Sequence, residues 1–299
     1  MGLYWEPCPG GARLLRLLGD TPCPAVPGTI EGLPVAELGP YCFADRPVRP
    51  GARRTGDETH EITGNFVEEV TLPDTVRVLD SAAFYNCRRL RRVTLGPGVE
   101  GFGSDLFTNC RQLQTFRLRA AADAPTGLKK LLGAVSADIT VELDGAQLFY
   151  PEYSEFLDEN TPAHIFNHSI EGEGYRMRQC FTPGGAVDYA AFDASFAQAC
   201  VGESEDKLCR LALGRLVQPF GLGDDARADY ELYLTAHPEA AFRRAIDDRD
   251  EAALRLLVGL SLPTADAAVY CAHVGWSAGA AVLLGRAKRA KKTYDFDDL

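Results

Sequence analysis

The chain has 299 residues, of which 46% are hydrophobic and 24% charged, and its net charge is −11. This size and composition are normal for a globular protein of about two domains, and the absence of any run of eighteen apolar residues excludes a membrane-spanning helix. Ten basic and twenty-two acidic residues lie between positions 142 and 260. That half of the chain should therefore repel nucleic acid and acidic membranes.

The first residues lack the features of an export signal. The apolar run at 14–18 is short and is interrupted by Arg16, and no basic segment precedes a continuous apolar one. The nine cysteines are odd in number and scattered, and they include no Cys-x-x-Cys pair. This distribution favours free thiols in a reducing compartment over a disulfide framework. We therefore expect a cytoplasmic protein.

A segment of about a dozen residues occurs twice. FYNCRRLRRVTL begins at Phe84, and FTNCRQLQTFRL begins 23 residues later at Phe107. Apolar positions outside these segments follow the same spacing, as in Val70, Val93 and Phe116. Such a period indicates stacked units, each of which buries its apolar side chains against the next. The defining residues are Phe84, Asn86, Cys87 and Leu90, matched by Phe107, Asn109, Cys110 and Leu113.

Each unit is predicted to contain one short strand and one turn. Val93, Thr94 and Leu95 alternate between apolar and polar, which is the period of a strand with one buried face. The Gly-Pro-Gly at 96–98 then ends the strand. We expect the Asn in the recurring turn to bond to backbone groups of its own and the neighbouring unit. The Cys beside it is small and apolar enough for a crowded interior.

The pattern Leu-Pro-x-x-Val-x-x-Leu-x-x-x-x-Phe-x-Asn-Cys-x-x-Leu resembles the BspA-like leucine-rich repeat, also called the Treponema type. Units 70–92 and 93–115 match it closely, and a degenerate unit upstream has Val35, Leu38 and Phe43 at the same relative spacing. The resemblance covers roughly the first half of the chain. It implies a solenoid with an extended surface that suits protein recognition.

The array departs from the family pattern at one place and continues into a further strand. Residues 46–64 are rich in Arg, Gly and Pro and poor in apolar residues, so we predict an exposed loop inserted after the first unit. ITVEL at 139–143 favours another strand, after the helical segment GLKKLLGAV at 127–135.

From about Tyr150 the apolar residues follow a helical period. Three sets have the spacing i, i+3, i+4, i+7 that is typical of an amphipathic helix. They are Cys209, Ala212, Leu213 and Leu216; Ala253, Leu256, Leu257 and Leu260; and Ala280, Leu283, Leu284 and Ala287. The last two sets, 27 residues apart, weakly resemble the second helices of ankyrin-type pairs, although the Thr-Pro-Leu-His signature is missing. We predict stacked antiparallel helix hairpins.

Together these patterns predict an α+β chain of two parts. A short leucine-rich-repeat solenoid, with one strand per repeat of about 23 residues, is expected for residues 1–146, including the inserted loop at 46–64. An all-α domain of stacked helix hairpins is expected for residues 147–299.

The strands of the solenoid should present a strip of solvent-facing side chains. Alternate residues of a strand point to opposite faces, so the neighbours of the buried apolar residues point outward. Arginine in such a strip suits a carboxylate on an acidic partner. The six residues of the predicted strip are Glu69, Thr71, Arg92, Thr94, Thr115 and Arg117.

An enzyme or metal site around residues 153–180 is the alternative hypothesis. His164 and His168 are four residues apart, which on a helix would place them on one face, and Cys180 is the only nearby thiol. However, no Glu lies between the two histidines, as a metalloprotease helix requires. No family signature for a nucleophilic pair surrounds Cys180. We therefore expect no metal site.

The sequence contains no convergent set of catalytic residues, and we expect no cofactor. A basic run at 285–292 ends the last predicted helix, where cations favour the helix dipole, and three acidic residues follow it. Nucleic-acid binding is therefore not the preferred interpretation. We predict a non-enzymatic protein–protein interaction or scaffold protein that binds other proteins and neither nucleic acid nor membranes.

Overall fold

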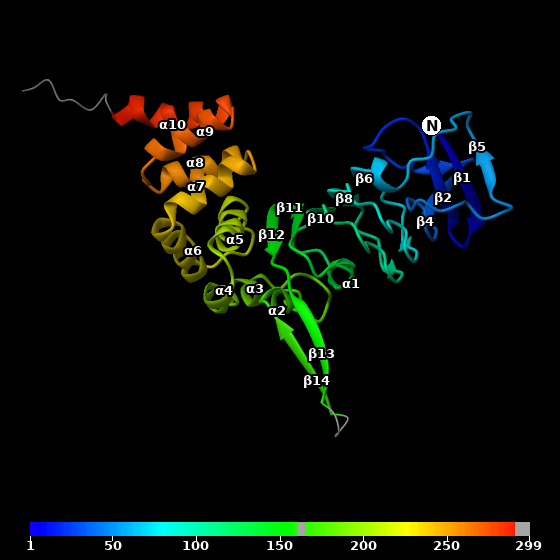
Figure 1. The fold of residues 1–299 in the computed structure, drawn as a ribbon, viewed down its shortest axis with the longest axis horizontal. Coiled ribbons are helices and arrows are strands. Elements are labelled where there is room, and N and C mark those ends of the chain that lie inside the picture. Colours follow the sequence, from blue (N-terminus) through cyan, green and yellow to red (C-terminus); the bar gives the residue numbers. More distant parts are fainter. Residues whose placement is uncertain (161–164, 291–299) are drawn as a thin grey trace, which may run out of the picture. The chain divides into compact units, whose positions relative to one another are not determined.

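A computed structural model of the chain describes residues 1–160 and 165–290 (Figure 1). The chain forms two compact units. The repeat unit comprises Met1–Gly145 and Tyr150–Asp188, and the helical unit comprises Ala146–Phe149 and the chain from Tyr189 onward. The sequence analysis instead placed a single boundary after residue 146. The difference arises because the stretch that follows forms strands before the first long helix begins.

The first sheet of the repeat unit begins at the N-terminus. β1 (Gly2–Cys8) and β2 (Gly11–Leu18) form an antiparallel hairpin, and β2 pairs in parallel with β4 (Leu33–Leu38). Parallel pairing continues through β7 (Val78–Leu79) to β9 (Gly101–Phe102), which belong to successive coils. The hairpin therefore covers the end of the stack that the first coil would otherwise leave open.

The second sheet contains the strands that the 23-residue period predicted. β6 (Glu69–Thr71), β8 (Arg92–Leu95) and β10 (Thr115–Ala121) pair in parallel in the predicted register. β11 (Ile139–Asp144) pairs next to β10, after the helix α1 (Leu128–Gly133), and both elements were predicted. The coils of β6 and β8 each contribute a second, two-residue strand to the first sheet, so they have two strands where one was expected.

One phenylalanine from each of three coils forms the centre of the core. Phe43, Phe84 and Phe107 are at most 6% exposed. The ring centroids of Phe43 and Phe84 are 5.2 Å apart and those of Phe84 and Phe107 are 5.3 Å apart, and both pairs are stacked. The predicted equivalence of Phe84 and Phe107 is confirmed, and so is the degenerate unit around Phe43. We call these three side chains the phenylalanine column.

The recurring Asn has a role that differs from the predicted one, whereas Cys87 is fully buried as expected. Asn86 and Asn109 have φ values of 62° and 63°, a left-handed conformation that Asn tolerates better than most residues. The Nδ2 of Asn109 donates to the Oδ1 of Asn86 at 2.8 Å, so the amides bond to each other. The thiols bond to the backbone instead. Cys87 and Cys110 donate to the phenylalanine carbonyl of the preceding coil at 3.3 Å and 3.0 Å.

All nine cysteines are free thiols. Burial raises the pKa of Cys42 and of Cys110 to about 12, and it raises the pKa of Cys87 still further from its ordinary value. These three thiols therefore stay protonated at neutral pH, which keeps Cys87 and Cys110 able to donate.

The insertion at 46–64 is partly a strand and not wholly a loop. β5 (Arg53–Thr55) pairs antiparallel with β1, and the guanidinium of Arg53 lies 5.0 Å from the ring centroid of Trp5. Ile62 is fully buried, just before the short 3-10 turn Gly64–Phe66. Most of residues 46–64 are exposed, as predicted, but β5 and the burial of Ile62 were not predicted, because a free strand edge and an aromatic face offer partners that a count of apolar residues does not reveal.

Arg16 is a buried cation beside the first coil. Its side chain is 1% exposed, and its Nη2 donates to the carbonyls of Tyr41 at 3.2 Å and Arg46 at 2.8 Å. Its Nη1 donates to the carboxylate of Glu61 at 3.1 Å. A terminal coil has no preceding coil to satisfy its turn carbonyls, and Arg16 supplies donors to two of them.

A proline-rich segment covers the outer edge of β6. The N–H of Thr71 donates to the carbonyl of Pro24 at 3.0 Å, and the N–H of Glu69 donates to that of Pro22 at 3.3 Å. The N–H of Val26 returns a bond to the carbonyl of Thr71 at 2.8 Å. The short strand β3 (Thr29–Ile30) follows and pairs with β4.

A separate two-stranded ribbon follows β12 (Ala146–Tyr150). β13 (Ser154–Asn160) and β14 (Ile165–Glu171) pair antiparallel (Figure 1). The short helix α2 (Gly174–Met177) comes next. We call the pair β13–β14 the ribbon. Residues 147–299 were predicted to be all helical, and the ribbon corrects that prediction for the residues before Tyr189.

Arg178 holds the base of the ribbon. It is 3% exposed, and its guanidinium donates to the carbonyls of Pro151 at 2.5 Å, Ala137 at 2.7 Å and Gly174 at 3.0 Å. It also lies 5.0 Å from the ring centroid of Tyr153. Burial lowers the pKa of Arg178 to about 10, although neighbouring groups favour its charged form.

The helical unit consists of stacked helix hairpins, as predicted. α5 packs against α6, α7 and α8, and the hairpin α7–α8 stacks on α9–α10 through contacts of α7 with α9 and of α8 with α10. Pro238 is at the first position of α7, where its missing N–H costs no helical bond. The helices are α3 (Tyr189–Ala194), α4 (Phe196–Gly202), α5 (Glu205–Val217), α6 (Asp224–Ala236), α7 (Pro238–Asp247), α8 (Glu251–Gly259), α9 (Ala265–His273) and α10 (Ser277–Ala290).

The register between the two hairpins differs by one residue from the prediction. Ala253 and Leu257 of α8 are buried, and the buried residues of α10 that match them are Gly279 and Leu283, 26 positions later. Leu284, which a spacing of 27 would bury, is 56% exposed. Spacings of 26 and of 27 residues both satisfy a helical period, so only the packing of the hairpins distinguishes them.

A buried polar cluster lies in the core of the helical unit. Arg215 of α5 has no exposed side-chain surface, and it donates to both oxygens of Asp193 of α3 at 2.7 Å and 2.9 Å. The hydroxyl of Tyr230 of α6 donates to the same carboxylate at 2.8 Å. The cluster joins three helices, because each member needs the other two to replace its lost hydration.

Candidate functional site

The six residues of the predicted strip lie on one face of the sheet β6–β8–β10. The strand register aligns them in two rows of three across these strands. Each is half-buried or exposed, whereas the alternate positions Val70, Val93 and Phe116 are at most 1% exposed. The rows are Glu69, Arg92 and Thr115, and Thr71, Thr94 and Arg117.

The two arginines of the strip already have carboxylate partners within the chain. Arg92 donates to the two oxygens of Glu142 at 2.7 Å and 3.2 Å, and Arg117 forms an ion pair with Asp144. Both acids come from β11, the strand beside β10. A partner therefore meets arginines that already have carboxylate partners, and the strip and its acids together are nearly neutral.

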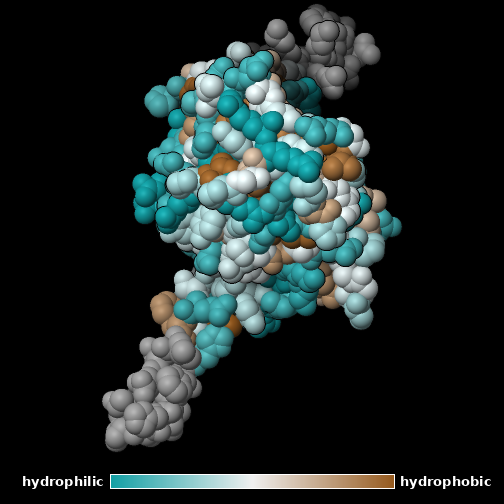
Figure 2. All heavy atoms as spheres, turned by 90° about the vertical axis from the view of Figure 1, so that its right-hand side faces the viewer, coloured by the Kyte–Doolittle hydropathy of each residue, from teal (hydrophilic) through white to brown (hydrophobic). Residues whose placement is uncertain are grey.

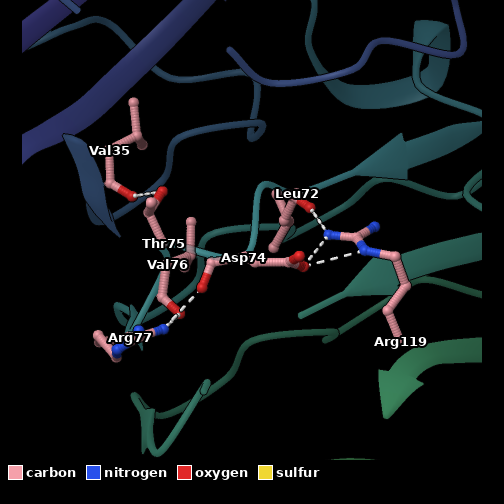
Figure 3. A network of polar contacts seen from close by, with 7 residues as sticks. All are labelled: Val35, Leu72, Asp74, Thr75, Val76, Arg77 and Arg119. Atoms are coloured by element: carbon pink, nitrogen blue, oxygen red, sulfur yellow. Dashed lines mark hydrogen bonds and ion pairs between the residues drawn. The ribbon is translucent and has the colours of Figure 1, made fainter. Parts of the chain in front are cut away.

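A polar network ties three coils together behind the turn that follows β6 (Figure 3). Arg119 of β10 donates to the carbonyl of Leu72 at 2.5 Å and to the carboxylate of Asp74 at 2.6 Å and 3.0 Å. In the same turn, the hydroxyl of Thr75 donates to the carbonyl of Val35 at 2.8 Å. Because these contacts cross coil boundaries, they hold the strands of the strip in a fixed relative position.

The residues of the alternative metal or enzyme site do not form a ligand set. His164 lies outside the described residues. His168 is exposed on β14, and its Nε2 is 3.1 Å from a carboxylate oxygen of Glu155. Cys180 is buried, and its thiol donates to the carbonyl of Arg176 at 3.6 Å. Within residues 1–160 and 165–290, no group of three His, Cys, Asp or Glu side chains could hold a metal ion.

A groove in the helical unit is a feature that sequence analysis missed. It has a volume of about 630 Å³ and lies along α7 and α9, with Phe242 and Ile246 on one side and Val269 and Tyr270 on the other. Val269 is 71% exposed. The helical period predicted the buried side of each hairpin, but the distance between neighbouring hairpins, which sets the groove, is not visible in the sequence.

None of the described helices is both long enough and apolar enough to cross a membrane. The face in Figure 2 is mostly hydrophilic, and its hydrophobic atoms form small, separate patches. A large exposed apolar patch, the usual mark of an obligate interface, is therefore absent from that face.

The two parallel sheets, the phenylalanine column and the recurring turn define a leucine-rich-repeat solenoid. Residues 61–124 match the family model described as BspA type leucine rich repeat region (6 copies). The repeat unit therefore contains a BspA-type leucine-rich-repeat region, as the resemblance indicated. Solenoids of this kind present extended surfaces that generally mediate protein interactions. No curated protein matches the chain.

Two solved structures are similar to part of the chain. The T. pallidum leucine rich repeat protein has 22% identity and a TM-score of 0.31, and the match covers 40% of this chain and 53% of that protein. A leucine rich cell surface protein from Faecalibacterium prausnitzii A2-165 has 20% identity and a TM-score of 0.29, with 48% and 41% covered. The matched region thus spans about half of the length of these proteins, or less.

Proposed function

We propose that this chain is a non-enzymatic protein-binding or scaffold protein, and that the strip on β6, β8 and β10 is part of its binding surface. The observation that supports this proposal most directly is the pair of side-chain rows on the sheet face, which the register keeps continuous over three strands. A rigid surface of this kind binds without the entropy loss that ordering a flexible loop would cost.

The charges of the strip determine what kind of partner surface it suits. Arg92 and Arg117 are paired with Glu142 and Asp144, so a partner meets paired charges and threonine hydroxyls and no unpaired cation. Complementary shape and matched hydrogen bonds are therefore more important than a net negative charge on the partner.

The experiment is affinity capture from the native cell with a variant that blocks the strip. Thr71→Arg with Thr94→Arg adds two long side chains to the outward face and leaves both ion pairs of the strip in place. The matched control is Thr235→Arg, because Thr235 is an exposed threonine of the helical unit. We expect the control to capture the same partner protein as the wild type. The double variant should capture at least about tenfold less of that partner.

A folding control is needed before a loss of capture can be assigned to the strip. Circular dichroism and the urea midpoint of the double variant should equal those of the wild type. A correctly folded double variant that captures the same protein in the same amount shows that the strip is not the binding surface.

We also propose that the protein works in the cytoplasm. The support is that all nine cysteines are free thiols, four of which are intermediate or exposed. Exposed thiols persist most readily where the surroundings are reducing. Fractionation of native cells followed by thiol labelling tests this proposal, and oxidised cysteines in freshly lysed cells contradict it.

A further inference from the structure

The ribbon has no cover on either face in its described side chains. Glu155 and Phe156 are consecutive in β13 and point to opposite faces, and both are exposed, with Phe156 44% exposed. On β14, Ser169 opposite Phe156 and Ile170 opposite Glu155 are exposed as well. A two-stranded ribbon that packs on nothing is at best marginally stable in water. Its apolar side chains therefore have surface available for a partner.

The outer edge of β13 is open for strand pairing. Among the described residues, β13 pairs only with β14, through seven consecutive residue pairs without a bulge. No proline lies within β13. An edge with these properties is a template to which an extended chain can add by backbone hydrogen bonds. The edge of β6 in the same chain differs, because the segment around Pro22 and Pro24 covers it.

The charge of the ribbon selects among the possible occupants of this edge. Between Glu152 and Glu173 the sequence has six acidic residues and no Lys or Arg, and three of the six acids lie in β13. A second copy of the ribbon would bring like charges together, which is unfavourable directly across a strand pair. Nucleic acid would be repelled for the same reason.

We propose that the outer edge of β13 binds an extended, Lys- or Arg-bearing segment of another protein, which adds to the ribbon as a third strand. In such a strand, alternate residues face opposite sides. Basic side chains on one side then lie beside Glu155, and apolar side chains on the other side cover Phe156. The partner segment therefore alternates basic and apolar residues. This surface is distinct from the strip on the repeat sheet, so an experiment can contradict one of the two proposals and leave the other unaffected.

The experiment uses the full chain and a labelled peptide with five Lys-Val repeats, measured by fluorescence anisotropy. A second peptide has the same charge, but two of its valines are replaced by proline, which cannot pair along an edge. A third peptide has five Glu-Val repeats. We expect the Lys-Val peptide to bind, the proline peptide to bind at least tenfold more weakly, and the Glu-Val peptide not to bind.

Two variants and a matched control locate the binding on the chain. Glu155→Lys reverses a charge beside the edge, and Phe156→Asn removes the exposed ring. Glu100→Lys makes the same charge change at an exposed position of the repeats. Both ribbon variants should weaken Lys-Val binding at least fivefold, and Glu100→Lys should bind as the wild type does.

Three results would overturn the proposal. Equal binding of the Lys-Val and proline peptides shows attraction by charge without strand addition. Unchanged binding by Glu155→Lys and Phe156→Asn places the peptide elsewhere on the chain. Sedimentation that shows a dimer of the wild type, lost in Phe156→Asn, shows that a second copy occupies the ribbon. Because the peptide comparison uses only the wild-type chain, it stays decisive even if a ribbon variant fails to fold.

Discussion

The repeat unit and the helical unit bury polar groups in opposite ways. In the coils the same contact recurs, since Cys87 and Cys110 each donate to the phenylalanine carbonyl of the coil before. In the helices one cluster, Asp193, Arg215 and Tyr230, occurs once and joins residues 22 and 37 positions apart. A contact that recurs leaves a period in the sequence, whereas a contact that occurs once leaves none. The following four experiments test this difference, beginning with the largest effect.

Truncation of the central ring of the phenylalanine column should have the largest effect at neutral pH. Phe84 is fully buried between Phe43 and Phe107, so Phe84→Ala should lower the free energy of unfolding of the repeat unit by about 4 kcal/mol. Urea denaturation with hydrogen exchange to assign the transition measures it. Phe220→Ala is the control, because Phe220 is 39% exposed in the helical unit. A loss below about 1 kcal/mol at Phe84 contradicts the column.

In the helical unit, Asp193→Asn should cost about 3 kcal/mol, because it leaves the buried charge of Arg215 without a counter-charge. Tyr230→Phe removes only one hydrogen bond to that carboxylate and should cost about 1 kcal/mol. The same denaturation experiment gives both values. If Asp193→Asn and Tyr230→Phe lower the free energy of unfolding by equal amounts, charge compensation is not what stabilises the cluster.

The buried thiols of the coils should make the repeat unit less stable at high pH. Burial raises the pKa of Cys42 to about 12 and that of Cys87 further still, whereas unfolded thiols ionise near pH 8.5. The unfolded state therefore loses these protons first, and stability is complete below about pH 8.5 and falls above it. Each thiol should contribute a slope of about 1.4 kcal/mol per pH unit.

The measurement is urea unfolding from pH 8 to pH 11 under reducing, oxygen-free conditions. Cys42→Ala with Cys87→Ala should reduce the slope of the repeat unit alone, and Cys110 contributes to the slope that remains. Cys209→Ala is the matched control: burial raises the pKa of Cys209 to about 12 as well, but it belongs to the helical unit. A repeat-unit slope that the double variant leaves unchanged shows that these thiols are not responsible.

The smallest expected effect concerns the turns of the two stacked hairpins. Arg249 precedes α8 with φ of 51°, and Gly275 occupies the matching place before α10 with φ of 67°. Arg249 is exposed, so Arg249→Gly relieves backbone strain without removing a packed side chain. Arg249→Gly should raise the free energy of unfolding by about 0.5–1 kcal/mol, and Gly275→Ala should lower it by a similar amount. Differential scanning calorimetry measures both, and Arg249→Lys should change nothing.

The solenoid could be predicted in detail because its contacts are local and repeated. The strands and the burial of Phe84 and Phe107 followed from one 23-residue period, and the degenerate coil at Phe43 followed from the same spacing of apolar residues within the unit. Within the same coils, the backbone bond expected of the Asn is made by the Cys, because composition identifies a turn but does not say which polar atom reaches the next coil. That question depends on the left-handed backbone at Asn86, which no pattern of residue types displays.

Contacts between distant positions were beyond the sequence. Arg92 meets Glu142 across 50 residues, and they meet only because β11 lies beside β10. The ribbon was missed for a different reason. Its strands bury no face in their described part, so they show no clear alternation of apolar and polar residues. The available signal was a segment rich in acids and without Lys or Arg, with Gly172 and Gly174 at its end.

The covered edge of β6 limits how this molecule can associate with itself. A stack of parallel strands is the geometry from which filaments grow, because each terminal strand can accept another chain. Here the groups of β6 that face this side are already bonded: the N–H groups of Glu69 and Thr71 to the carbonyls of Pro22 and Pro24, and the carbonyl of Thr71 to the N–H of Val26. Another chain therefore cannot add to β6 without displacing this segment, and fibre growth from the edge of β6 is opposed.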